Sequence, residues 1–237
     1  MFKIGLSICT AILLAGCGAP QPRPAQNVPR ELATSPAVGV LPTPPSGVPV
    51  YRIDGSHSEI RLLVYRAGPM AKFGHNHVMV NDAVSGWVAE TGGVQGASLS
   101  LRVPVADFVV DDAEARAAEG ADFSEEVGGE ARDGTRHNML SETCLDGDRY
   151  PSITLTSRSV TMVEGKPVAT LVVNVAGHES TLVVPFMLTT SPDRLLGSGT
   201  FVLRQSDLGL VPFSILLGAL QVQNDITVKF NLVAVKS

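Results

Sequence analysis

Residues 225–235 read Asp-Ile-Thr-Val-Lys-Phe-Asn-Leu-Val-Ala-Val in this 237-residue chain. The even-numbered positions from Ile226 to Ala234 are apolar, whereas Thr227, Lys229 and Asn231 lie between them. Side chains alternate between two faces along a β-strand, so the pattern indicates a strand with one buried and one solvated face. This segment therefore predicts an antiparallel sheet as the frame of the fold.

Shorter runs of the same kind recur upstream between turn residues, and helical periodicity is scarce. With the final run they give nine candidate strands, at 50–54, 58–66, 75–90, 96–104, 152–160, 166–176, 179–190, 195–204 and 225–235. Turns at hairpin spacing, Glu164-Gly165-Lys166 and Gly177-His178-Glu179, indicate up-and-down order. The region 50–237 is thus expected to form one antiparallel barrel or sandwich.

Two segments depart from simple alternation. Leu171-Val172-Val173 and Leu182-Val183-Val184 are apolar on both faces, so they need cover from a helix, a second sheet or a partner chain. Between Asp111 and Asp133 there are nine acids and two bases, a net charge of −7. Its acids lack the spacing of a calcium loop, so we interpret this stretch as a solvated acidic insertion rather than a cation site. A short helix is expected over 129–144.

The amino terminus predicts export. Lys3 and the apolar run 4–14 are typical of a signal peptide over 1–16, and Leu14-Ala15-Gly16-Cys17 resembles the lipobox of bacterial lipoproteins. Cys17 would then carry lipid and anchor the chain in a membrane of the bacterial envelope, facing the periplasm. By the same resemblance, Gly18 favours the outer membrane. Residues 17–49, with nine of the 16 prolines, predict an extended tether.

The cysteine count agrees with this processing. Cys9 would leave with the signal peptide and Cys17 would carry lipid, so Cys144 would stand alone in the mature chain. No intrachain disulfide is then expected, and we interpret Cys144 as a small hydrophobic residue.

Composition and motifs exclude several functions. A net charge of −5 and an aromatic content of 5% offer neither a basic surface for phosphates nor a stacking platform, so nucleic acid is not an expected partner. The sequence shows no nucleophile elbow, phosphate loop or Cys-His pair. We therefore expect a protein that is not an enzyme and uses no cofactor.

Four groups of residues, in order, are similar to YceI-like domains, the lipid- or polyisoprenoid-binding proteins. The opening segment is Tyr51-Arg52-Ile53-Asp54-Gly55-Ser56-His57-Ser58-Glu59-Ile60. It is followed by Arg132-Asp133 through His137, Leu140 and Ser141, by Tyr150-Pro151-Ser152-Ile153-Thr154, and by Gln205-Ser206-Asp207-Leu208-Gly209 with Asn224-Asp225-Ile226-Thr227-Val228. The resemblance spans about residues 50–236.

This resemblance implies an all-β fold, a lipocalin-like antiparallel barrel of about eight strands with the acidic, partly helical insertion. It also implies a long apolar pocket for an isoprenoid or fatty chain, with a homodimer as a candidate assembly. An eight-stranded interior holds one small ligand only if its lining is not bulky, and this chain is rich in Val, Leu and Ala. Where the family has a looser Gly-x-Phe segment, residues 73–77 read Phe-Gly-His-Asn-His, so the head-group environment is expected to differ.

Histidines and arginines are the candidate polar ligand groups. His75 and His77 would share one strand face about 7 Å apart and could chelate a metal with a third ligand, His57 and His137 being the available imidazoles. The alternative places these side chains at the barrel mouth, hydrogen-bonded to the lipid head group. Arg136, with Arg132 and Arg61, could bind a pyrophosphate or carboxylate head bidentately.

Asp54 and Ser58 flank the first turn. There we expect side chains that cap backbone amides rather than catalytic groups.

The leading hypothesis is an envelope lipoprotein that binds a long apolar lipid for sequestration or transport. The alternatives are a metal- or haem-binding redox protein using His75 and His77, and a structural module that binds a partner through its doubly apolar strands.

Overall fold

The computed structural model describes residues 41–237. The predicted signal peptide, Cys17 and most of the tether lie outside these residues. The described residues belong to one compact unit, and every member of its four core clusters lies between Tyr51 and Ala234. The unit therefore has a core of its own.

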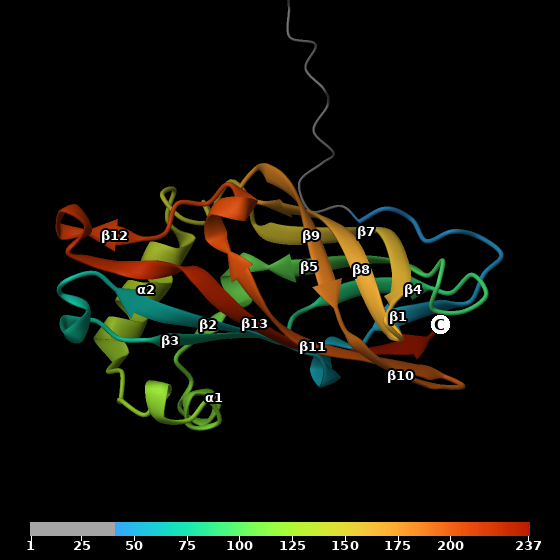
Figure 1. Cartoon of the computed structure of the whole chain (residues 1–237), viewed down its shortest axis with the longest axis horizontal. Helices are drawn as coiled ribbons and strands as arrows, with labels where there is room; N and C mark the ends of the chain where they lie inside the picture. Colours follow the sequence, from blue (N-terminus) through green and yellow to red (C-terminus); the bar gives the residue numbers. More distant parts are fainter. Residues whose placement is uncertain (1–40) are drawn as a thin grey trace, which may run out of the picture. The chain divides into compact units, whose positions relative to one another are not determined.

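Thirteen antiparallel strands and two short α-helices form the unit (Figure 1). The strands are β1 Val50–Ile53, β2 Glu59–Ala67, β3 His77–Asn81, β4 Ser85–Ala89, β5 Ser98–Pro104, β6 Val109–Val110, β7 Ser152–Val163, β8 Lys166–Val175, β9 His178–Pro185, β10 Met187–Ser191, β11 Arg194–Arg204, β12 Ser214–Ile215 and β13 Leu220–Lys236. The helices are α1 Ala113–Ala117 and α2 Gly129–Leu140. Within residues 41–237 no helix is both long and apolar enough to cross a membrane.

The prediction of an all-β antiparallel fold with few helices is confirmed, but the prediction of about eight strands in a barrel is wrong. The sheet has thirteen strands, and its hydrogen-bonded path does not close within residues 41–237, because β9 pairs only with β8 and β10 only with β11. The nine predicted runs correspond to eleven strands, since 75–90 splits into β3 and β4 and 179–190 into β9 and β10. The other two, β6 and β12, have two residues each.

Both splits have a cause in the hydrogen bonds around them. After β3, the Asn81 side chain turns back, donating to the Pro104 carbonyl (2.8 Å) and accepting from the Ala83 amide (3.1 Å), so residues 82–84 leave the ladder. After β9, Pro185 has no amide hydrogen, and the Phe186 amide donates to the Pro167 carbonyl before β10 pairs with β11. One long run thus changes partners at Pro185.

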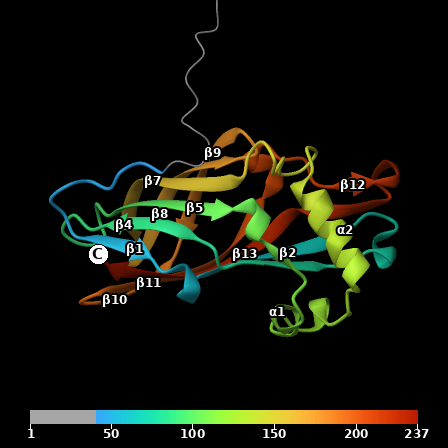
Figure 2. The same cartoon turned by 180° about the vertical axis from the view of Figure 1, so that it is seen from behind.

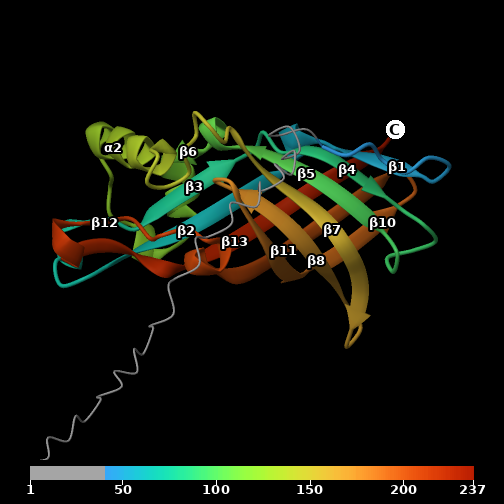
Figure 3. The ribbon, with the colours of Figure 1, turned by 90° about the horizontal axis from the view of Figure 1, so that it is seen from above.

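Strand β13 is the centre of the sheet. Its 225–235 stretch pairs with β11 along one edge, and its other edge pairs with β2 and, at 234–236, with β1. The predicted alternation holds: Ile226, Val228 and Ala234 are buried. Figure 3 shows β5, β7 and β8 side by side, with β11 and β13 running beneath them.

Helix α2 of the insertion lies across one end of the sheet (Figure 2). Its Met139 packs into the core cluster with Val64 of β2 and Val110 of β6. The predicted helix over 129–144 is observed, ending four residues earlier at Leu140.

Ser58 joins the first strands to β13. Its hydroxyl accepts from the Val233 amide (2.9 Å) and donates to the Asp54 carbonyl (2.7 Å), and the residue is buried. Ser58 thus binds an amide of β13, whereas the prediction was a cap within the first turn. The Asp54 carboxylate instead accepts from the Ser56 hydroxyl (2.6 Å) and lies 2.8 Å from Nδ1 of His57.

We expect Ser58→Ala to lower the free energy of unfolding by about 1–3 kcal/mol, because the buried Val233 amide would lose its partner. The matched control is Ser56→Ala, which removes an exposed hydroxyl from the same turn and should change stability little. Urea denaturation measures both. Equal stability losses in the two variants would contradict this role for Ser58.

Candidate functional site

An apolar cavity of about 190 Å³ lies inside the curved sheet. Strands β1, β2, β4, β5, β7, β8, β9, β10, β11 and β13 all contribute to its lining. The inward residues of β13 line it in sequence, at Val228, Phe230, Leu232 and Ala234. The predicted aliphatic lining is present together with three aromatic rings, those of Phe186, Phe201 and Phe230.

The two doubly apolar segments use one face each for this cavity. Leu171 of β8 and Leu182 and Val184 of β9 line it. On the opposite faces Val172 is half-buried and Val183 is exposed. The cavity thus accounts for one apolar face of each strand.

Only two lining residues carry polar side chains, Glu90 and Thr190. Glu90 directly follows β4, and Thr190 is the penultimate residue of β10. Ala89, the last residue of β4, pairs with Val50 at the start of β1. Ser191, the last residue of β10, pairs with Arg194 of β11, which in turn pairs with Val235 near the end of β13. Because the end of β13 pairs with β1, both strand ends lie at the same end of the sheet. The Tyr51 hydroxyl lies 3.5 Å from the Glu90 carboxylate. The lining is therefore apolar along its length and polar at one end.

The predicted ligand residues lie elsewhere. His57 is exposed beside Asp54, His137 is exposed on α2, and Nη2 of Arg136 donates to the Ala106 carbonyl at 2.7 Å. Neither they nor His75 and His77 line the cavity. Their assignment to a lipid head group remains a prediction.

His75 and His77 are neighbours with different partners. Their ring centroids are 6.3 Å apart. Nδ1 of His77 lies 2.7 Å from Asp111 Oδ2, and Nδ1 of His75 lies 3.5 Å from Glu125 Oε1. In the described part of the chain, no three His, Cys, Asp or Glu side chains are grouped as a metal site would require.

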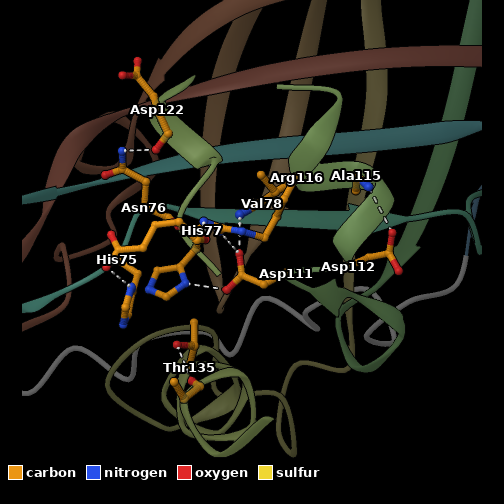
Figure 4. A network of polar contacts seen from close by, with 12 residues as sticks. His75, Asn76, His77, Val78, Asp111, Asp112, Ala115, Arg116, Asp122 and Thr135 are labelled. Carbon is orange, nitrogen blue, oxygen red and sulfur yellow. Dashed lines mark hydrogen bonds and ion pairs between the residues drawn. The ribbon is translucent and has the colours of Figure 1, made fainter. Parts of the chain in front are cut away.

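Asp111 is the centre of a buried polar network (Figure 4). Its carboxylate accepts from the Val78 amide (2.9 Å) and from Nη1 of Arg116 (2.6 Å), in addition to its contact with His77. Burial alone would raise the pKa of Asp111, but the hydrogen bonds from His77 and Val78 hold it below the ordinary 3.8. Arg116 also donates to the carbonyls of Asn76 and Glu125. The network fixes the acidic insertion to β3.

A second contact fixes the same insertion to the outer face of the sheet. The Glu119 carboxylate lies 2.8 Å from Arg61 Nη1 and 2.5 Å from Lys229 Nζ. Burial raises the pKa of Glu119, but hydrogen bonds from Lys229 and Arg61 bring it below its usual value. Arg61, a predicted head-group ligand, therefore binds an acid of the insertion.

Cys144 is half-buried, and burial raises the pKa of its thiol. An uncharged thiol in this setting fits the expected small hydrophobic role.

Sequence reasoning missed Glu90 and Gly197. Glu90 shares the inward face of its run with Val88, so a charge on an otherwise apolar face was the available signal. Gly197 lines the cavity from β11, and the space beside its Cα is open to 4 Å. Glycine spacing alone carries no such information, because the open space depends on the opposite strands.

The comparisons with known proteins bear on the family and on the fold. The family model of the YceI-like domain matches residues 51–234. The crystal structure of Burkholderia cenocepacia BcnA is similar, with a TM-score of 0.56 and 15% identity over 76% of this chain and 98% of that chain. A Campylobacter jejuni YCEI protein gives a TM-score of 0.48 and 12% identity over 67% and 84% of the two chains. Among curated proteins, none matches.

We expect Asp111→Asn to lower the free energy of unfolding by about 3 kcal/mol, because Arg116 would keep a buried charge without its counter-ion. Glu114→Gln, which neutralises an exposed acid on α1, is the matched control and should be close to neutral. Urea denaturation at neutral pH compares them. A neutral Asp111→Asn would refute the role of the ion pair.

The same ion pair predicts that the stability of the fold depends on pH. The pKa of Asp111 is lower in the folded than in the unfolded chain, so its contribution is complete above about 3.8 and is lost as the pH falls through the folded value. The stability difference between wild type and Asp111→Asn should therefore shrink below this pH.

Proposed function

We propose, because this chain belongs to the YceI-like domain family, that its sheet holds a long apolar lipid, a polyisoprenoid or fatty chain, for sequestration or transport. The protein would bind this lipid without transforming it. The observation that carries the proposal is the cavity, whose lining is apolar except at Glu90 and Thr190.

The polarity of the cavity and the run of lining residues along β13 support this occupant. An engineered apolar cavity of about 150 Å³ stays dry and binds benzene, and the cavity here is about 190 Å³, so it would hold one part of a long chain while the rest extends beyond it. Each Å² of apolar ligand surface removed from water contributes roughly 25 cal/mol. A chain threaded along the β13 face would contact Val228, Phe230 and Leu232 in turn.

We further propose that the protein is a lipoprotein of the bacterial envelope, anchored through lipidated Cys17 and facing the periplasm, with the outer membrane favoured. The lipobox-like residues 14–17 and the proline-rich tether support this location. The intact mass of the membrane-extracted protein tests it. A mature chain that begins at any residue other than a lipidated Cys17 would refute it.

The polar end of the cavity favours a neutral head group. Glu90 is the one ionisable residue in the lining, and no Lys, Arg or His lies beside it there. Glu90 is half-buried, and a carboxylate at the end of an apolar lining repels a second anion and accepts a hydrogen bond from a hydroxyl. We therefore expect an alcohol to bind more tightly than the acid of equal chain length.

Filling the cavity tests the proposal. Gly197→Leu would place a side chain in the lumen, where its Cβ has no atom within 4 Å, and we expect it to reduce binding of a radiolabelled C16 alcohol by about tenfold or more. The matched control, Gly134→Leu, adds the same side chain on α2, where space is also open. The assay uses residues 36–237, because this unit contains its own core.

Native mass spectrometry and solvent extraction of the same unit identify any lipid that copurifies. If Gly197→Leu binds the alcohol as tightly as the wild type does, the lipid must bind outside the cavity. Absence of both copurified lipid and alcohol binding would refute the proposed function.

Head-group preference is tested with Glu90→Gln. The wild type should bind hexadecanol at least about tenfold more tightly than palmitate at neutral pH, because Glu90 repels the carboxylate. The amide variant should lose most of this difference while keeping its affinity for the alcohol. Glu179→Gln, on the exposed start of β9, should preserve the difference. Equal wild-type affinities would contradict the role assigned to Glu90.

A further inference from the structure

Two neighbouring loops carry an exposed apolar tip, formed by the side chains of Phe73, Val211, Ile215, Leu216 and Leu217. Phe73 ends a 3-10 helix (Ala71–Phe73), and the others surround β12 and a second 3-10 helix (Leu216–Gly218). Phe73 is 65% exposed, Val211 75%, and Leu217 fully exposed at 109%. Figure 1 shows β12 at the end of the sheet opposite the carboxy terminus. Exposed apolar side chains that gather at one end of a fold mark an interaction surface.

The two loops form one surface. The Met70 amide donates to the Ala219 carbonyl at 2.8 Å. Gly68 has φ +90°, and a Cβ there would lie 2.6 Å from the same carbonyl oxygen, so only glycine permits this approach. The loop that carries Phe73 is therefore bound to Ala219, the residue that follows the leucine turn.

The leucine turn is strained. Leu216 and Leu217 have φ of +52° and +56°, in the left-handed region that leucine rarely adopts. Leu217 gains no burial in return, because its side chain is fully exposed. Strain of this kind at an exposed turn points to a function for the turn rather than to packing.

The tip also lacks negative charge. Residues 209–223 contain no charged side chain, and residues 67–74 contain only Lys72, whose ammonium lies 5.0 Å from the Phe73 ring. Arg66, which directly precedes the second stretch, is paired with Glu125 at 3.2 Å. The whole chain has a net charge of −5, but the tip carries no negative charge of its own. An anionic membrane therefore does not repel this surface.

We propose that the apolar tip inserts into the interfacial layer of a lipid bilayer, with Leu216 and Leu217 leading and Lys72 facing the lipid phosphates. A protruding leucine enters a fluid bilayer without a matching hollow, whereas a second copy of the chain would have to provide one. The insertion is independent of the Cys17 anchor and of any lipid in the cavity. It would present the domain to the membrane in one orientation.

Flotation of residues 36–237 with phosphatidylcholine vesicles, with and without phosphatidylglycerol, tests the proposal. Leu216→Asn/Leu217→Asn should weaken vesicle binding by about tenfold or more, since it removes two apolar side chains from the bilayer. Asparagine tolerates the left-handed conformation, so the fold should be kept, and an unchanged melting temperature verifies this. The matched control is Val183→Asn/Val202→Asn, which changes two exposed valines outside the tip and should bind like the wild type.

Lys72→Gln should abolish the gain that phosphatidylglycerol gives and leave binding to phosphatidylcholine intact. Failure of the wild type to float, or equal losses in the two double variants, would overturn the proposal. The proposal would also be overturned if the wild type formed a dimer in sedimentation velocity, the leucine variant were monomeric and the wild type did not bind vesicles. The tip would then contact a second copy of the chain.

Discussion

The pairing of β13 is the constraint on which the rest of the structure depends. This one strand hydrogen-bonds to β11 along one edge and to both β2 and β1 along the other. Its inward side chains supply part of the core at Ile226 and part of the cavity from Val228 to Ala234. A shift of register by one residue would turn all of them to the solvent face, so core and cavity are fixed by the same hydrogen bonds.

Burial and charge are used differently at the two ends of the sheet. At the end where β4 and β10 terminate, Glu90 and Thr190 meet the apolar lining. Toward the other end, side chains of β2, β3, β6 and α2 fill the interior. The strongest ion pairs lie outside the cavity and hold the acidic insertion, through Asp111 and Glu119. Fixed structural contacts thus engage His77, Arg61 and Arg116, and the lining is left apolar.

The sequence predicted the strands better than the sheet. Period-two alternation located β13 and most other strands because alternation reports burial of one face, which is a local property. It missed the breaks at Asn81 and Pro185, since these depend on bonds to Pro104 and Pro167, which only the fold brings near. The partners of the polar site residues could not be predicted. The spacing of His75 and His77 indicates a shared site, but their partners Glu125 and Asp111 lie more than thirty residues away in the chain.

By itself, the sequence determined the class of fold, the family and the position of the acidic insertion, because these follow from side-chain periodicity, ordered motifs and local charge. The tertiary structure alone decided that the sheet stays open between β9 and β11, and that Gly197 and Glu90 face a common space. It also brought the loop that carries Phe73 to Ala219, directly after the leucine turn of residues 216–218. Each of these depends on strands or loops distant in sequence meeting in one register, and no local pattern encodes that distance.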